Sequence, residues 1–298
     1  MHARVLGAGA GGGFPQWNCD CRLCSGLRRG TLSASPRTQA SLAVSSDGKQ
    51  WLLLGASPDI ATQIARTPEL WPSGGSRHSP IAAVAIPNGD VDAWAGLLSL
   101  RESTPLELLA TPMVQRELVA ENAVLRTLDR FAGHTRWTAL AAGHAVTVAG
   151  LEVEPVAVAG KPPLHMMGRR PPSDEDNVGF LVRHGGATLG WFPSVAAPSP
   201  ALERALAGCD VLFFDGTFYR DDELIEAGLG RARARDMGHW PVGGAEGSGA
   251  FLATMPARAK WLVHVNNTNP LLDDESIERA ALRAAGLDVA RDGQEWAS

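Results

Sequence analysis

Short apolar runs rich in valine and leucine recur along this chain between glycine and proline residues, and they restrict it to a fold with many short strands. The runs "ASLAVS" (40–45) and "WLLLG" (51–55) flank "SDGK", which predicts a β-hairpin. "VGFLVRHGG" and "ATLGWF" predict a second hairpin. Further strands are predicted for "RVLG", "IAAVAI" (81–86), "LELLAT", "HAVTVAG", "LEVEPVAVA", "DVLFFDG" and "KWLVHV".

Helical patterns separate these groups of strands. They cover "VDAWAGLLSLRE", 113 to about 131, 199–207, 243–254 and 273–285. Because the strands come mostly in antiparallel groups with helices at intervals, the pattern favours two packed sheets with helices on their outer faces over one doubly wound sheet. The proline-rich, charged segment 162–177 predicts an exposed flap, and no disordered linker divides the chain, so we expect one domain over residues 1–298.

Composition excludes several classes of protein. The formal net charge is −5 and no basic block occurs, so we expect no nucleic-acid partner. The N-terminal stretch "MHARVLGAGAGGG" lacks the basic region and apolar core of a signal peptide, and no apolar run is long enough to span a membrane. Three of the four cysteines are too close together for ordinary disulfide pairing, which indicates a reducing cytoplasm and a metal.

The three clustered cysteines are Cys19, Cys21 and Cys24, in "WNCDCRLC". A loop with this Cys-x-Cys-x-x-Cys spacing can direct three thiolates at one tetrahedral zinc ion. The alternative is three reduced cysteines that only pack in a turn. Three cysteines within six residues favour zinc, while the spacing leaves the fourth ligand open.

A glycine run, "GAGAGGG", precedes the cysteines and matches G-x-G-x-x-G at Gly7, Gly9 and Gly12. It follows a predicted strand, as a dinucleotide-binding fingerprint requires. However, it leads into "FPQWNCDC" and does not open a helix, and no βαβ unit follows. We therefore expect a tight turn that carries the backbone past the metal loop.

Acidic and histidine residues gather at the ends of predicted strands. They are Asn88, Asp90 and Asp92 after the strand 81–86, Asp215 in "FFDG", His239 in "MGHW" and His264 in "WLVHVNNTN". Individually, each has a simpler role, such as capping a helix or forming a turn. Together, carboxylates and imidazoles at strand ends are the ligands that a divalent metal site requires. The candidate catalytic residues are therefore Asp90, Asp92, Asp215 and His239.

These residues also carry a resemblance to a known family. The chain resembles the PqqB family (coenzyme PQQ synthesis protein B) of the metallo-β-lactamase-fold superfamily. The resemblance runs nearly end to end through "GAGGGFPQWNCDCRLC", "RTQASLAVSSDG", "WLLLGASPDI", "RHSPI", "NGDVD", "GLLSLRE", "LFFDGT", "DDE", "MGH" and "HVNNTNP". It implies an αββα sandwich, in which two mixed sheets carry helices on their outer faces.

The resemblance also implies a function in the biosynthesis of pyrroloquinoline quinone (PQQ). PQQ is assembled from a glutamate and a tyrosine of a precursor peptide, and the implied reaction is hydroxylation of an aromatic amino acid by non-haem iron and dioxygen. The implied partners are a small molecule or dipeptide cut from that peptide, with a homodimer as one option for the assembly. The cysteine loop is implied to hold a structural zinc, completed by His264 or another residue of "HVNNTN", and the flap arginines at 169–170 are expected to meet substrate carboxylates.

One position departs from the family pattern. The superfamily motif His-x-His-x-Asp-His maps onto Asn88, Asp90, Asp92 and Ala93, and relatives usually retain the last histidine. A methyl group cannot bind a metal, so Ala93 removes one imidazole from the implied iron site. The site is left with Asp90, Asp92, Asp215, His239 and whatever His264 can provide, and the candidate metal ligands among them are Asp92, Asp215, His239 and His264.

Two other functions remain open at this stage. A paralogue without metal chemistry would bind or carry a pathway intermediate or product and keep the zinc for stability. A metallo-β-lactamase-fold hydrolase such as a phosphodiesterase is less favoured, because a dinuclear hydrolytic site needs histidines that Asn88, Asp90 and Ala93 replace.

Overall fold

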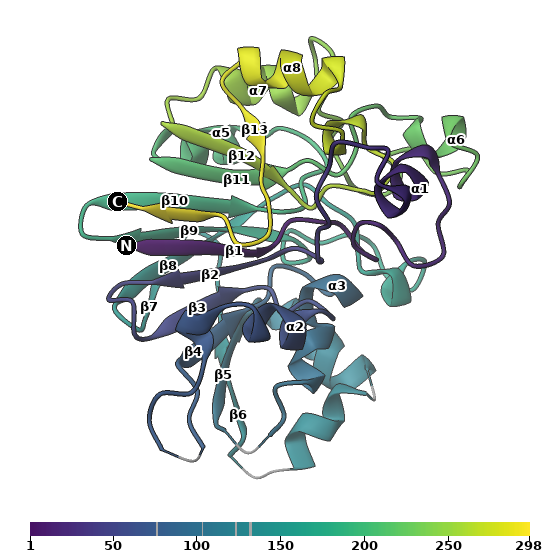
Figure 1. Cartoon of the computed structure of the whole chain (residues 1–298). Helices are drawn as coiled ribbons and strands as arrows, with labels where there is room; N and C mark the ends of the chain where they lie inside the picture. The colour runs from purple at the N-terminus through teal and green to yellow at the C-terminus, as the bar shows by residue number, and fades with distance from the viewer. Residues whose placement is uncertain (76, 103, 123, 131–132) are drawn as a thin grey trace.

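Two sheets packed face to face form the centre of the molecule (Figure 1). The computed structural model describes residues 1–75, 77–102, 104–122, 124–130 and 133–298. Within them the first sheet has the strand order β14-β1-β2-β3-β4-β5-β6 and the second has the order β13-β12-β11-β10-β9-β8-β7. β14, near the C-terminus, pairs antiparallel with β1, so the two ends of the chain lie close to each other at one side of the first sheet (Figure 1).

The strand bounds in the first sheet are β1 His2–Gly7, β2 Ser41–Ser45, β3 Trp51–Leu54, β4 Ile81–Ala85, β5 Leu106–Ala110, β6 Thr135–Ala139 and β14 Glu295–Ala297. Those in the second are β7 Val146–Val148, β8 Leu151–Ala157, β9 Val178–His184, β10 Ala187–Phe192, β11 Val211–Asp215, β12 Ala259–Val263 and β13 Asp288–Val289. Both predicted hairpins are present, as the antiparallel pairs β2–β3 and β9–β10.

Helices and short helical turns connect the strands. The α-helices are α1 Arg22–Arg29, α2 Ile60–Ala65, α3 Val91–Trp94, α4 Pro112–Arg116, α5 Pro200–Ala207, α6 Glu223–Glu226, α7 Ser248–Ala253 and α8 Ile277–Ala284. The 3₁₀ turns are η1 Pro68–Leu70, η2 Ala95–Leu98, η4 Leu125–Arg130, η5 Leu164–Met166 and η6 Pro270–Leu272, and η3 Glu117–Glu121 is a π-helical turn. No helix among the described residues is long and apolar enough to cross a membrane.

Successive side chains of the strands point to opposite faces of each sheet, and the buried ones form three apolar layers, one between the sheets and one on each outer face. In β9, Phe180 and Val182 pack in the core between the sheets, while Leu181 packs on the opposite side under α5 and α7. In β3, Leu52 and Leu54 belong to the same central core, and other side chains of the strand face the helices of the first sheet. Because successive side chains of a strand point to opposite faces, buried strands of this kind require helices on both outer surfaces. The expected two-sheet sandwich with outer helices is therefore confirmed.

The helix expected from 113 to about 131 is wrong as a continuous element. It divides into α4, η3 and η4, and Asn122 between the last two has an extended backbone, with φ −114° and ψ 101°. The Asn122 side-chain oxygen accepts a hydrogen bond from Val124 N at 3.0 Å, a local turn that competes with the helix. Positions 123, 131 and 132 at its breaks lie outside the described residues.

The sheet topology brings distant segments to one edge. β10, β11 and β12 are parallel neighbours, and so are β3, β4, β5 and β6. Parallel strands end at the same edge of a sheet, which places the ends of β11 and β12 together in the second sheet. The packing of the two sheets brings the segment after β4 of the first sheet to the same place. Asp90, Asp92, Asp215 and His264 are on these segments.

Candidate functional site

A buried carboxylate and two imidazoles form a cluster at this edge. Asp215 ends β11, His264 directly follows the neighbouring strand β12, and His239 comes from the loop between α6 and α7. One potential ligand atom from each of the three residues lies within 4.8 Å of the other two. Two imidazoles and a carboxylate at this spacing can hold one divalent metal ion.

Asp215 is fully buried, and every contact of its carboxylate favours the charged form. One oxygen accepts from Val195 N at 2.9 Å and lies 2.7 Å from His239 Nδ1. The other accepts from the backbone N and the hydroxyl of Thr217, at 3.0 and 2.6 Å. Burial acts to raise the pKa of Asp215, but the charge and hydrogen bond of His239 outweigh it, so the pKa lies below its ordinary value.

His264 connects this carboxylate to the segment after β4. Its Nε2 lies 2.7 Å from Asp92 Oδ2, and its Nδ1 lies 2.8 Å from the Thr217 hydroxyl. Burial acts to lower the pKa of His264, but Asp92 raises it above its ordinary value. The backbone of His264 is in the left-handed region, with φ +57°, which is uncommon for a residue with a side chain and marks a locally imposed orientation. Its ring stacks on that of His239, with centroids 5.3 Å apart.

Asp90 is in the same region but has different partners. Its carboxylate lies 3.2 Å from Lys161 Nζ and accepts from Leu164 N at 3.4 Å. The structure therefore groups Asp215, His239, His264 and Asp92 in one set of contacts, while Asp90 contacts the start of the flap. Asn88 takes part through its side-chain oxygen, which accepts from Asp90 N at 3.0 Å.

A cavity of about 790 Å³ opens at the cluster. Its wall is mainly apolar, and the residues of this site that line it include Asn88, Asp90, Asp92, Lys161, Leu164, Thr217, His239 and His264. Ala93 also lines the cavity, so the residue at this position, next to Asp92 in sequence, borders the open space. Such a cavity beside a possible metal site has the dimensions of a small-molecule site.

The glycine run forms part of the same wall. Gly11 and Gly12 line the cavity, and a side chain at Gly11 would come within 3.6 Å of Asp92 Oδ2. Ala10 N donates to Val265 O at 3.0 Å, so the run lies against the segment that carries His264. β1 pairs antiparallel with β2, which rules out a βαβ unit here. The glycine run therefore forms a tight turn beside the cysteine loop, as its sequence context predicts.

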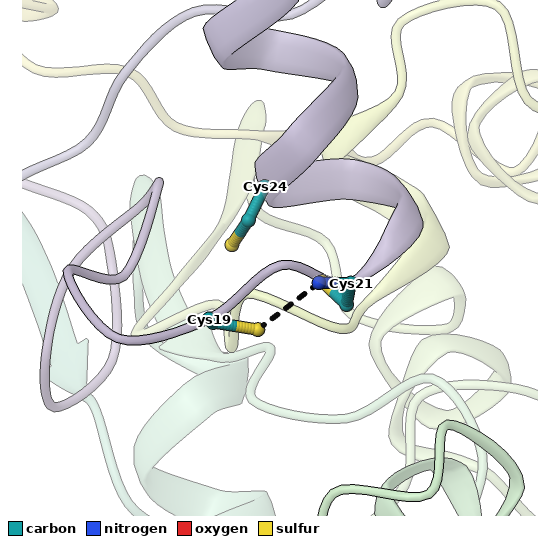
Figure 2. A group of neighbouring side chains, drawn as sticks. All are labelled: Cys19, Cys21 and Cys24. Carbon is teal, nitrogen blue, oxygen red and sulfur yellow. Dashed lines mark hydrogen bonds between the residues drawn. The ribbon is translucent and has the colours of Figure 1, made fainter.

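The three thiols form a second cluster (Figure 2). Cys24 is in the first turn of α1, and Cys19 and Cys21 are on the loop just before it. Their sulfur atoms all lie within 4.8 Å of one another. Cys24 is completely buried, and burial raises the pKa of its thiol to about 12. Cys19 is also buried and Cys21 is half-buried. Three thiols gathered in this way fit a metal cation, because a cation stabilises thiolates, including that of Cys24, which burial disfavours.

Of the two alternatives for the residue that completes the thiol cluster, His264 or another residue of "HVNNTN", His264 is not at the thiols. Its imidazole is committed to Asp92 and Thr217, as described above. The side-chain amide of Asn267 instead lies against the thiols, with Nδ2 at 3.1 Å from Cys19 Sγ and 3.4 Å from Cys24 Sγ. The residue that contacts the cysteines is therefore another member of "HVNNTN", three positions further along.

Three contributors to the site were missed in the sequence. Thr217 hydrogen-bonds or contacts Asp215, His239 and His264 together, and its position two residues after the strand-end aspartate was the available signal. Asn267 belongs to a quoted motif but offers an amide, which is seldom a zinc ligand. Lys161 was noticeable only as one of three lysines in the chain.

The flap arginines do not line the cavity, which corrects the expectation that they meet a substrate there. Arg170 forms ion pairs with Glu117 and Asp176, both almost completely buried. Arg169 is largely exposed and lies 3.9 Å from Glu121. Both guanidinium groups are thus paired with carboxylates of the protein itself.

Fold and sequence together place the chain in a superfamily. Residues 50–265 match the model of the Beta-lactamase superfamily domain. The two-sheet sandwich therefore belongs to the β-lactamase superfamily, in agreement with the expected metallo-β-lactamase-like fold.

More specifically, the chain belongs to the family of coenzyme PQQ synthesis protein B. It is 47% identical to that protein of Methylobacterium sp. (strain 4-46), over 98% of both chains. It is 41% identical to that of Azotobacter vinelandii, over 99% of both chains. The crystal structure of Zn²⁺-bound PqqB from Methylobacterium extorquens has 42% sequence identity and superimposes over the full length of both chains with a TM-score of 0.94.

Proposed function

We propose that this chain acts in the synthesis of coenzyme PQQ as an iron(II)-dependent hydroxylase of an aromatic amino acid derived from a peptide. Family membership supports the pathway. The observation that carries the chemistry is the grouping of Asp215, His239 and His264, with one donor atom each within 4.8 Å. Two histidines and one carboxylate suit iron(II) in oxygenases, because they leave coordination positions open.

Each residue has a distinct role in this proposal. Asp215, His239 and His264 hold the metal, and bound iron(II) supplies the activation of dioxygen. Asp92 orients the imidazole of His264 through the 2.7 Å contact at Nε2, which leaves Nδ1, 2.8 Å from the Thr217 hydroxyl, as the nitrogen that would bind the metal. Partners of this kind fix the orientation of metal ligands in many sites.

The cavity supplies the substrate site. Trp191, Pro193 and Phe218 are among the residues that line it, and they offer apolar surface to an aromatic ring. The apolar wall also excludes water from the reacting ring. A substrate cut from a precursor peptide carries carboxylate groups in addition to the ring, and these need a polar partner in the same cavity.

A carrier protein for a pathway intermediate or product is the second candidate function, and Ala93 favours it. The position lines the cavity but provides no donor, which leaves the site with fewer imidazoles than the superfamily motif contains. A protein of this kind would keep the cavity and the thiol cluster while losing the chemistry.

Metal content separates the two functions. The protein is to be purified without oxygen, supplied with iron(II), and analysed for iron and zinc alongside oxygen consumption with a tyrosine-containing dipeptide. Zinc together with iron and substrate-dependent oxygen uptake supports the hydroxylase. Zinc alone, with ligand binding but no oxygen uptake, supports the carrier.

The thiol cluster is proposed to hold a structural zinc ion through Cys19, Cys21 and Cys24, with Asn267 beside it. Replacing Cys21 with serine is expected to release the zinc and to lower the melting temperature, because metal binding energy at such a site contributes to folding. Zinc analysis and thermal unfolding measure both effects. Cys209→Ser, at a buried cysteine far from the cluster in sequence, is the control and should retain zinc. Unchanged zinc content in Cys21→Ser would contradict the assignment.

Replacing Ala93 with histidine is expected to raise the affinity for iron(II). The protein as purified should have zinc at the thiols and a second site that is empty or only partly filled, because Ala93 leaves that site one imidazole short of the superfamily motif and a nitrogen donor helps to retain iron(II). The new imidazole has space in the cavity. The neighbouring Trp94 does not obstruct it, since its indole donates to Gly89 O at 2.9 Å and packs in the core under the first sheet.

Equilibrium dialysis with iron(II) measures the effect of Ala93→His. Ala93→Leu is the matched control, because it fills the same space without a donor and should not increase iron binding. Near-stoichiometric iron retained by the unaltered protein through dialysis would contradict the prediction.

A further inference from the structure

We propose that Lys161 is the carboxylate-recognition residue of the cavity and that Asp90 holds its ammonium group until a substrate carboxylate replaces it. The proposal rests on the proposed function only in taking the cavity as the substrate site. It assigns a specificity-determining residue and makes the substrate an aromatic compound with at least one carboxylate.

Charge distribution in the cavity is the first observation. Of the described residues that line it, Lys161 alone carries a permanent positive charge. Arg169 and Arg170 are paired elsewhere, as shown above. The lining carboxylates other than Asp90 are Asp92, which is matched by His264 at 2.7 Å, and Asp236, which accepts from Arg233 N at 3.1 Å. A carboxylate that enters this largely apolar space therefore has one protein ammonium group available to it.

The exposure of the Lys161–Asp90 pair is the second observation. The two charges are 3.2 Å apart, and the side chains retain 26% and 30% exposure. A pair in contact with solvent contributes little to folding, because water screens it. Replacing Asp90 by a substrate carboxylate therefore costs little free energy, whereas separating Arg170 from its buried partners would cost much more.

The placement of Lys161 is the third observation. Its carbonyl accepts from Asn177 Nδ2 at 2.8 Å, and Asn177 in turn pairs with Asn88 after β4. Its aliphatic stem lies close to Gly238, where a side chain would come within 3.3 Å of Lys161 Cγ. Backbone and stem are thus fixed, while the ammonium group faces the cavity with one protein carboxylate.

Unpartnered polar atoms in the same cavity are an independent observation. The buried ring nitrogens Trp191 Nε1 and His165 Nε2 have no hydrogen-bond partner among the described residues, and both side chains line the cavity. Buried polar groups in native structures are almost always satisfied. Both nitrogens lie beneath the surface of the cavity wall, so the wall carries polar groups just behind its apolar surface.

A pair of probes tests the proposal without any reaction. 3-(4-Hydroxyphenyl)propionate and its amide have the same ring and length, but only the acid is charged. Calorimetric titration of the protein as purified should give an acid affinity about tenfold above that of the amide, the expected size for one charged hydrogen bond. Lys161→Met, which keeps the stem but removes the charge, should bring the two affinities within about twofold.

Further variants separate recognition from folding. Lys49→Met changes an exposed lysine in the β2–β3 turn and should preserve the tenfold preference. Asp90→Asn removes the competing carboxylate and should tighten binding of the acid but not of the amide. Zinc content and melting temperature of Lys161→Met should match those of the unaltered protein.

Several results would overturn the proposal. They are a preference for the acid that survives in Lys161→Met, an equal loss of both ligands in that variant, and an unaltered protein that binds neither probe or does not prefer the acid. If the preference for the acid over the amide is lost in His239→Ala but kept in Lys161→Met, the substrate carboxylate binds the metal and not Lys161. Because no turnover is measured, a protein that lacks hydroxylase activity can still support the role of Lys161.

Discussion

Replacing His239 with alanine is expected to reduce iron(II) affinity and hydroxylation by about a hundredfold or more. Loss of groups that only orient metal ligands already costs about 10–100-fold, and His239 is proposed as a ligand itself. The change also removes the imidazole that lies 2.7 Å from the buried carboxylate of Asp215. Iron titration and oxygen consumption measure the two effects.

His144→Ala is the matched control for this prediction. His144 is exposed in the loop before β7 and should leave iron binding unchanged. Zinc at the thiol cluster should persist in His239→Ala, because that residue does not contact the cysteines. Iron affinity within a few-fold of the unaltered protein would show that the metal, if bound, uses other ligands.

Replacing Arg170 with methionine is expected to destabilise the protein by about 3–5 kcal/mol, the cost of leaving buried charges without a partner. The Arg170 Nε donates to Glu117 at 2.5 Å and Nη1 donates to Asp176 at 3.0 Å. Glu117 is completely buried and Asp176 is 1% exposed. The hydrogen bond with Asp176 is the largest cause of a raised pKa at Arg170, so the guanidinium remains charged.

Urea unfolding measures the effect, with Arg169→Met as control. Arg169 is adjacent in sequence, but its side chain is 59% exposed and its ion pair with Glu121 spans 3.9 Å, so a change of at most about 1 kcal/mol is expected. Adding Glu117→Gln to Arg170→Met should restore part of the lost stability, since one of the two uncompensated charges is gone. Equal losses for the two arginine variants would contradict the role of the buried pairs.

Local features of the sequence predicted most of the fold. The hairpin β2–β3 follows from a turn sequence between two apolar runs, and the three-layer core follows from alternation that reaches both faces of strands such as β9. These signals are local, because strand periodicity and turn chemistry depend on neighbours within a few residues. The long helix after β5 was wrong for the related reason that Asn122 prefers a turn contact over the helical one.

The sequence by itself also determined which residues are candidates for chemistry. The cysteine spacing places three thiols on one loop and helix turn, so their convergence needed no information from elsewhere in the chain. The strand-end positions of Asp92, Asp215 and His264 likewise marked them as candidate metal ligands, but β4 is in one sheet and β11 and β12 are in the other, so only the packing of the two sheets brings the three residues together.

Only the tertiary structure decided how the two clusters divide the "HVNNTN" segment. A left-handed backbone at His264 directs its imidazole to Asp92, and Asn267, three residues later, meets the thiols. It also decided that Asp90 contacts Lys161 while Asp92 contacts His264, although the two aspartates are two positions apart. The physical reason is that each partner comes from a segment between about 70 and 250 residues away, brought close by sheet pairing and side-chain packing, and such distances in sequence carry no local signal.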